Sequence, residues 1–208
     1  MAGHSLATIK KEKRKKKKEG RKLNNFDYYY WKKFFNLNEL KHLNKICNTY
    51  KEINFIDLPA TKDNKKLKHV DRVESVKWIH LKKPLHQLYE FIVITNRDKY
   101  GYYINPMLDV DGVLFNTYVK GDFYDWHKDE SISPYHDYKF TILINNSTNK
   151  YLGGDFQIFS TGGEKTVNEF NQPGDVVMFK SDIPHKVLPI KTGKRNSIAF
   201  FIKGSKFV

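Results

Sequence analysis

Residues 152–202 read LGGDFQIFSTGGEKTVNEFNQPGDVVMFKSDIPHKVLPIKTGKRNSIAFFI, and this stretch decides the fold class. Short runs rich in β-branched and aromatic residues alternate here with turn residues such as Gly162-Gly163, Pro173-Gly174 and Thr192-Gly193. The same texture begins near residue 100, and short strands with turns about every 8–12 residues are typical of antiparallel sandwiches and barrels. The runs that we expect to be strands are Tyr102–Ile104, Val113–Val119, Phe140–Ile144, Asp155–Phe159, Thr166–Phe170, Val176–Phe179, Lys186–Ile190 and Ser197–Ile202. The sequence therefore predicts a mainly β protein with a jelly-roll core.

Upstream of residue 100 the apolar pattern favours helices. From Trp31 to Tyr50 the apolar residues recur at helical spacing, and Asn36 followed by Glu39 would start a new helix within this segment. Pro84 opens a second amphipathic segment, since proline suits a first helical position. Residues Val73–Leu81 are expected to form a strand between them. We expect both helices to pack on the outside of the jelly roll.

Positive charge is concentrated at the N-terminus. The chain has 208 residues, with 37 Lys and Arg against 23 Asp and Glu, a net charge of +14. Residues 10–22 hold ten basic residues and two acids, and a segment with so few large apolar side chains cannot offset its ordering entropy. We expect residues 1–25 to form a flexible basic tail and residues 26–208 a single domain, with N-terminal helical support over 26–99 and the jelly-roll core over 100–203.

The single cysteine, Cys47, rules out a disulfide framework and a zinc site built from several cysteines. No run approaches the roughly 20 apolar residues of a membrane span, and no signal-peptide-like stretch precedes the basic residues. The expected protein is therefore soluble and intracellular, in the cytoplasm, with no membrane partner.

Candidate metal chemistry lies at the end of the stretch Tyr118–Asp129. In extended backbone His127 and Asp129 point to the same face, because side chains alternate with period two, while Trp126 would point to the opposite face and pack in the core. A second histidine would complete the two-His, one-carboxylate set that binds Fe(II) and leaves positions open. His185, at the start of a later strand, is the candidate.

A bare His-x-Asp motif is weak support for a metal site, and this chain contains a second copy at His69-Val70-Asp71. The second copy lies beside a Lys-rich loop. It lacks the tyrosines that precede the first copy by nine and three residues, Tyr118 and Tyr124. We expect His69 and Asp71 to lie on a solvated surface.

The combined pattern is more specific than any one motif. Residues from about 72 to 203 resemble the prolyl/lysyl hydroxylase-like branch, or prolyl 4-hydroxylase-like family, of the Fe(II)/2-oxoglutarate-dependent dioxygenases. The segments that carry the resemblance are Tyr118–Asp129, Leu152–Phe159 and Pro173–Lys203. It implies a double-stranded β-helix, a cupin-like jelly roll, which is the architecture that the strand pattern suggests independently.

The resemblance also implies an iron centre. His127, Asp129 and His185 resemble the iron ligands of the family. The implied cofactors are Fe(II), the cosubstrate 2-oxoglutarate and O₂, with ascorbate as a further candidate.

Four more residues resemble the family's cosubstrate site. Arg195 resembles the residue that pairs with the distal carboxylate of 2-oxoglutarate, for which a bidentate guanidinium is well suited. Ser197, on the same strand face as Arg195, and Tyr118 resemble hydroxyls that bind the same carboxylate. Tyr124 would line the cosubstrate pocket or the substrate side.

Three functions follow, from two classes. The leading one is hydroxylation of proline in a peptide or protein, with release of succinate and CO₂. The second is the same chemistry on a free amino acid, a small metabolite or an alkylated nucleobase, although only five of the 37 basic residues are Arg, few for gripping nucleotides. The third, of a different class, is binding of nucleic acid or an acidic partner through residues 10–22.

Overall fold

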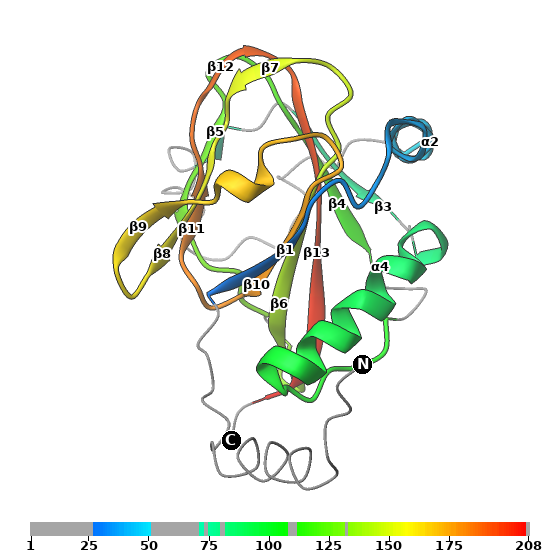
Figure 1. Cartoon of the computed structure of the whole chain (residues 1–208), viewed down its shortest axis with the longest axis vertical. Coiled ribbons are helices and arrows are strands. Elements are labelled where there is room, and N and C mark those ends of the chain that lie inside the picture. The colour runs from blue at the N-terminus through cyan, green and yellow to red at the C-terminus, as the bar shows by residue number, and fades with distance from the viewer. Residues whose placement is uncertain are drawn as a thin grey trace, which may run out of the picture.

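The computed structural model of the chain describes residues 27–50, 71–72, 75–79, 82–107, 112–131 and 133–206. The larger sheet contains, in order, β1 (Tyr28–Trp31), β10 (Val176–Lys180), β6 (His136–Asn145), β13 (Arg195–Ser205), β4 (Val113–Tyr118) and β3 (Ser75–Ile79). The smaller sheet contains β2 (Asp71–Arg72), β5 (Phe123–His127), β11 (His185–Val187), β8 (Phe156–Ser160) and β9 (Gly163–Thr166), and β7 (Tyr151–Gly153) pairs with β12 (Ile190–Gly193). Neighbouring strands run antiparallel (Figure 1). This double-sheet arrangement confirms the predicted jelly roll.

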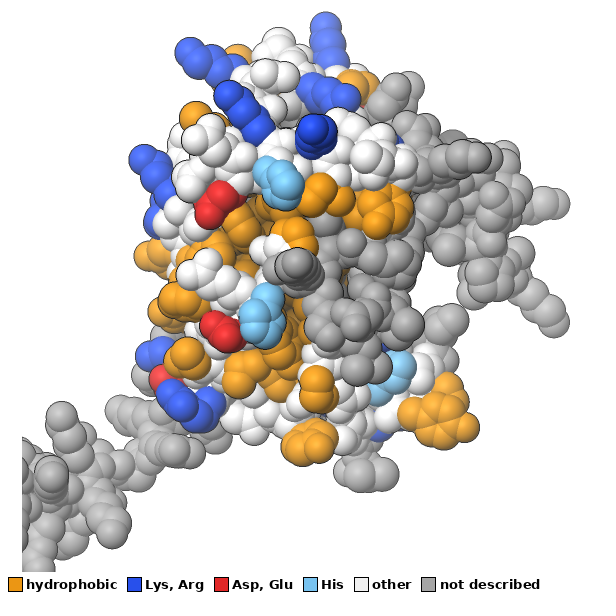
Figure 2. All heavy atoms as spheres, turned by 90° about the vertical axis from the view of Figure 1, so that its right-hand side faces the viewer, with side chains coloured by type: hydrophobic (Ala, Val, Ile, Leu, Met, Phe, Trp, Pro, Cys, Tyr) orange, Lys and Arg blue, Asp and Glu red, His pale blue; other side chains and the backbone are white. Residues whose placement is uncertain are grey.

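The larger sheet is buried on both faces, which explains why its central strands are almost continuously apolar. In β6, Phe140, Ile142 and Ile144 face one hydrophobic cluster, whereas Leu143 faces another. The first cluster includes residues of the helices α2 (Leu37–Cys47) and α4 (Lys82–Thr95), and the second includes residues of the smaller sheet. The helices therefore cover the outside of the larger sheet, as predicted. Figure 2 shows this helical face, where apolar side chains gather between the two helices.

The predicted helix start at Asn36 is confirmed, but the helical stripe does not extend back to Trp31. The Asn36 side chain accepts hydrogen bonds from the amides of Asn38 and Glu39, and the Glu39 carboxylate accepts one from the Asn36 amide, which makes a complete capping box. Trp31 ends β1, which pairs with β10 in the larger sheet. The aromatic run is therefore an edge strand, because pairing with β10 outweighs the helical spacing of its residues.

The other predicted helix and strand are confirmed with shifted bounds. α4 starts at Lys82, two residues before Pro84, and ends in a π-helical turn, η2 (Asn96–Tyr100). β3 covers the centre of the predicted strand Val73–Leu81. None of the helices in the described ranges is long and apolar enough to cross a membrane.

Three of the eight strands predicted after residue 100 were wrong or divided. Tyr102–Ile104 is irregular, because the Asn96 side chain hydrogen-bonds both the amide and the carbonyl of Tyr102 in place of a strand neighbour. Thr166–Phe170 contains only the last residue of β9 and then the 3₁₀ helix η3 (Asn168–Phe170). Lys186–Ile190 is divided between β11 and β12, with Pro189, which has no amide hydrogen to donate, between them.

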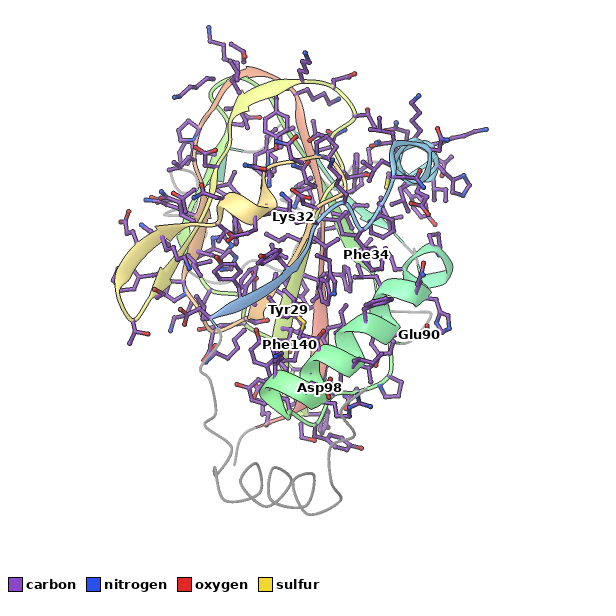
Figure 3. The ribbon with its side chains drawn as sticks, viewed as in Figure 1. Tyr29, Lys32, Phe34, Glu90, Asp98 and Phe140 are labelled. Atoms are coloured by element: carbon purple, nitrogen blue, oxygen red, sulfur yellow. The ribbon has the colours of Figure 1, made fainter. Side chains whose placement is uncertain are left out.

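The turn before β10 anchors β1 to the larger sheet. The buried carboxylate of Asp175 accepts hydrogen bonds from the Lys32 ammonium at 2.7 Å and from the Lys33 amide at 2.9 Å. Figure 3 shows Lys32 at the end of β1, with Phe34 directed toward α4, where it contacts Phe91 edge-on at 5.4 Å. The segment after β1 is therefore held by polar contacts on one side and aromatic contacts on the other.

Gly174 in this turn tolerates no side chain, and replacing it with alanine will destabilise the fold. Its φ is +84°, and a Cβ would lie 2.0 Å from the carbonyl oxygen of Phe35. We expect Gly174→Ala to lower the free energy of unfolding by about 2–5 kcal/mol, from the left-handed backbone and the steric clash together. Urea denaturation measures this. Gly162→Ala, at a position with open space around it, is the matched control; equal stability of the two variants would contradict this account.

Candidate active site

A cavity of about 230 Å³ lies between the two sheets. All of the sequence-predicted site residues line it, and they come from β4, β5, the segment after β5, β11 and β13. These residues are Tyr118, Tyr124, His127, Asp129, His185, Arg195 and Ser197. The structure therefore brings the complete predicted set together in one place.

A β-bulge in β5 aims His127 into the cavity. Against β11, His127 pairs with His185 and Tyr124 pairs with Val187, so two residues of β5 lie opposite the single residue Lys186. The extra residue lets Tyr124 and His127 both line the cavity, with their rings 3.8 Å apart, despite odd spacing. Simple alternation could not predict this.

Trp126 points away from the cavity, as alternation predicts, but it does not pack in the core as expected. Trp126 is partly exposed and is not among the residues that line the cavity. Its ring contacts Phe159 edge-on at 6.1 Å, and the Lys186 ammonium lies 4.4 Å from the ring centre. Trp126 therefore belongs to a surface cluster on the outer side of the smaller sheet.

Three side chains converge at one end of the cavity. The His127 Nε2 lies 3.7 Å from the Asp129 Oδ1, and the His185 Nε2 lies 3.3 Å from the Asp129 Oδ2. Each histidine is oriented by its other nitrogen: the His127 Nδ1 lies 2.7 Å from the Asp125 carbonyl oxygen, and the His185 Nδ1 lies 2.9 Å from the Ile183 carbonyl oxygen. Because a carbonyl only accepts, both Nδ1 atoms carry a hydrogen, which leaves each Nε2 as the nitrogen available to a metal ion. Two imidazole nitrogens and one carboxylate can hold a divalent metal ion such as Fe(II).

The charge states also suit metal binding. Burial and the neighbouring His185 lower the pKa of His127 to about 4, so its imidazole is neutral at neutral pH. Burial alone would raise the pKa of Asp129, but hydrogen bonding and attraction to His185, with help from Thr141, outweigh it and lower the pKa. Asp129 is therefore ionised beside the neutral imidazole of His127, which suits coordination of a metal ion.

Arg195 also lines the cavity, is 1% exposed and lies near two aromatic rings. Its guanidinium carbon is 5.3 Å from the ring centre of Tyr118 and 5.8 Å from that of Phe170. Within the described part of the chain nothing accepts a hydrogen bond from its buried Nη1. A buried cation with an unmet donor calls for an anionic ligand, and the carboxylate of 2-oxoglutarate, with Ser197 also on the cavity wall, fits this requirement.

Sequence reasoning missed two polar residues that contact the triad. The Thr141 hydroxyl lies 2.6 Å from the Asp129 Oδ2 and 2.9 Å from the Ser181 Oγ. Both residues are 1% exposed. The signal in the sequence was the single hydroxyl of Thr141 within the otherwise apolar run Phe140–Ile144. The strand prediction for this run gave Thr141 no role.

His69 of the second His-x-Asp motif lies outside the described residues. Asp71 belongs to β2, whose backbone pairs with β5 opposite Tyr124. Among the described residues, the only His, Cys, Asp or Glu group close enough to hold a metal ion is His127, Asp129 and His185.

Comparisons with known proteins agree with this geometry. Residues 113–203 match the model of the 2OG-Fe(II) oxygenase superfamily. A PKHD-type hydroxylase of Synechococcus sp. (strain CC9605) is 34% identical over 88 residues, which cover 41% of this chain and 39% of that relative. The matched region thus spans about two fifths of the relative's length.

Solved structures share the fold at low sequence identity. A prolyl-4-hydroxylase of Pseudomonas putida aligns with a TM-score of 0.63 at 16% identity, over 88% of this chain and 96% of that chain. A prolyl hydroxylase of Trichoplax adhaerens, in complex with a hypoxia inducible factor peptide fragment, aligns with a TM-score of 0.61 at 15% identity, over 96% and 93% of the two chains. Residues 113–203, which include His127, Asp129, His185 and Arg195, are thus similar to the 2OG-Fe(II) oxygenase superfamily, and the solved structures share the fold of this chain.

Proposed function

We propose that this chain is an Fe(II)- and 2-oxoglutarate-dependent hydroxylase that acts on proline within a peptide or protein. The observation that supports the proposal is that His127, Asp129 and His185 converge in the same cavity as Arg195, whose Nη1 has no hydrogen-bond acceptor among the described residues. The three would hold the iron, and Arg195 would pair with the distal carboxylate of 2-oxoglutarate. Iron and 2-oxoglutarate, when bound, activate O₂ and supply the oxidising equivalents for C–H hydroxylation, with release of succinate and CO₂.

The protein's own contribution is binding, orientation and exclusion of water. Tyr118 and Ser197 line the cavity beside Arg195 and would donate further hydrogen bonds to the cosubstrate, while Tyr124 packs against the His127 ring. The remaining walls are largely apolar, with Leu143, Phe156 and others, so charges inside are poorly screened and interact strongly. Such a site holds a small dianion firmly.

The opening of the cavity supports a peptide substrate. Drug-sized ligands occupy pockets of about 300–1,000 Å³, so a cavity of about 230 Å³ fits a small cosubstrate and leaves a longer substrate outside. Leu114, Asn116 and Phe201 line the cavity and are partly exposed, as are Tyr124, His127 and Asp129. Two apolar side chains and one amide suit an apolar proline ring with a peptide carbonyl beside it. The structural neighbour that carries a bound peptide supports the same class of substrate.

Mass spectrometry of proline-containing peptides tests this function. The full chain is incubated with Fe(II) and 2-oxoglutarate, with and without ascorbate, and we expect a gain of one oxygen on proline together with succinate. Ascorbate as a supporting reductant is tested in the same assay. Succinate formation with no oxygenated peptide, but with an oxygenated free amino acid, metabolite or nucleobase, would overturn the proposed substrate and leave the cofactor chemistry intact.

Residues 10–22 lie outside the described part of the chain, and their role is a separate proposal: they would bind nucleic acid or another acidic partner. Deletion of residues 1–25 should change the rate of uncoupled 2-oxoglutarate decarboxylation by no more than about twofold, because ten basic residues without metal ligands cannot perform oxidation. The same deletion should weaken nucleic-acid binding and reduce the salt dependence of that binding. Both are measured on one truncated protein. Loss of decarboxylation by a folded truncation would show that the domain begins before residue 26.

A further inference from the structure

Thr141 is a buried hydroxyl in the middle of the otherwise apolar strand segment of β6. Its neighbours Phe140 and Ile142 face the helical layer, so Thr141 faces the cavity, whose wall it forms. A buried hydroxyl costs free energy unless it is hydrogen-bonded. Both of its contacts are polar: the Asp129 Oδ2 at 2.6 Å and the Ser181 Oγ at 2.9 Å.

The directions of these two hydrogen bonds follow from chemistry. An ionised carboxylate only accepts, so the single Thr141 hydroxyl hydrogen is donated to Asp129. Thr141 must then accept from Ser181, which makes a directed chain from Ser181 through Thr141 to Asp129. A distance of 2.6 Å falls in the range of charge-assisted O–H···O⁻ bonds, about 2.5–2.7 Å, which are stronger than neutral ones.

The chain of hydroxyls joins the segments that carry two of the proposed ligands. Asp129 follows β5, whereas Ser181 follows β10 and lies four residues before His185. The backbone reinforces the link, because the Asp129 amide donates to the Ser181 carbonyl at 3.0 Å. Ile183, between Ser181 and His185, accepts from the His185 Nδ1. The placement of Asp129 relative to His185 therefore depends on hydroxyl contacts that cross three segments.

We propose that Thr141, supported by Ser181, is a positioning residue that holds the Asp129 carboxylate in its metal-binding orientation. The Asp129 Oδ2 accepts the hydrogen bond from Thr141. The Asp129 Oδ1 accepts no hydrogen bond from the described residues and lies 3.7 Å from the His127 Nε2. Asp129 would thus present one oxygen to the metal rather than rotate. This inference rests on the proposed function, since it assigns the triad as the metal site.

Binding of Co²⁺ to the metal-free full chain tests the proposal without any turnover assay. Thr141→Val keeps the shape of the side chain and removes the hydroxyl, and we expect Co²⁺ affinity to fall about 10–100-fold, the usual cost of losing a partner of a metal ligand. Thr141→Ser keeps the hydroxyl and should bind Co²⁺ within about threefold of the wild type. Ser181→Ala leaves Thr141 in place but removes its donor, so a smaller loss of about 3–10-fold is expected.

Thr117→Val is the matched control. Thr117 is also a buried threonine of the larger sheet with one side-chain hydrogen bond, 3.2 Å to the Asn196 Oδ1, and it does not line the cavity. It should bind Co²⁺ as the wild type does. Thermal unfolding of each metal-free variant separates lost affinity from lost folding, and Thr141→Ser and Ser181→Ala keep the test informative if Thr141→Val does not fold.

Wild-type Co²⁺ affinity in Thr141→Val and Ser181→Ala would overturn the positioning role and leave the proposed function standing. Equal losses in Thr141→Val and Thr117→Val would also overturn it, since the effect would then be a general one on the sheet. A wild-type chain that binds no Co²⁺ would overturn both proposals. The failure of this inference and the failure of the proposed function are therefore distinguishable.

Discussion

Alanine in place of His127 or Asp129 will lower 2-oxoglutarate turnover by more than about 100-fold. This loss exceeds the roughly 10–100-fold loss expected when only a residue that hydrogen-bonds a metal ligand is removed. Each variant removes one of the three proposed metal ligands, and among the described residues no other His, Cys, Asp or Glu lines the cavity. Metal affinity should fall together with turnover, because two ligands hold a divalent ion far more weakly than three. Succinate production and Co²⁺ titration of the same preparations measure the two effects.

The second His-x-Asp motif supplies the control for this experiment. His69→Ala makes the same chemical change in a motif that lacks the upstream tyrosines, and it should leave turnover within about twofold. If His69→Ala abolished turnover and His127→Ala did not, the metal site would be assigned to the wrong motif.

The second large effect concerns Arg195. Arg195→Ala should raise the KM for 2-oxoglutarate by about 100-fold or more, since losing one partner of a buried, hydrogen-bonded charge pair costs about 3–5 kcal/mol. Arg195→Lys keeps the charge but loses the planar fork, so a smaller rise of about tenfold is expected. Steady-state kinetics at varied 2-oxoglutarate, with saturating iron, resolves the two variants.

Lys194→Ala is the neighbouring control, because Lys194 is exposed and does not line the cavity. It should leave the KM for 2-oxoglutarate unchanged. Because Arg195 lies near the rings of Tyr118 and Phe170, the unfolding transition of each Arg195 variant must be recorded as well. Unchanged KM values in folded Arg195→Ala and Arg195→Lys would remove Arg195 from the cosubstrate site.

Elements whose stabilising contacts lie close together in the chain could be predicted from the sequence, whereas elements set by distant contacts could not. The Asn36 cap was readable because its hydrogen bonds reach only two or three residues along the chain. Strands β4, β10 and β13 were readable because apolar side chains and flanking turns mark them directly. The strand assignment of Thr166–Phe170 failed because Phe170 is buried by its position in a 3₁₀ turn next to Arg195, which periodicity does not report.

The sequence by itself determined the class of fold and, through its resemblance to a known family, predicted that His127, Asp129, His185 and Arg195 belong to one site; all four line the same cavity. Only the tertiary structure decided that a bulge lets Tyr124 and His127 line the same cavity, that Trp126 is partly exposed, and that Thr141 and Ser181 meet at Asp129. The physical reason is the range of each interaction. Caps, turns and alternation depend on neighbours in the chain. A bulge, or the hydrogen bonds that join Ser181, Thr141 and Asp129, depends on the register between strands that lie tens of residues apart.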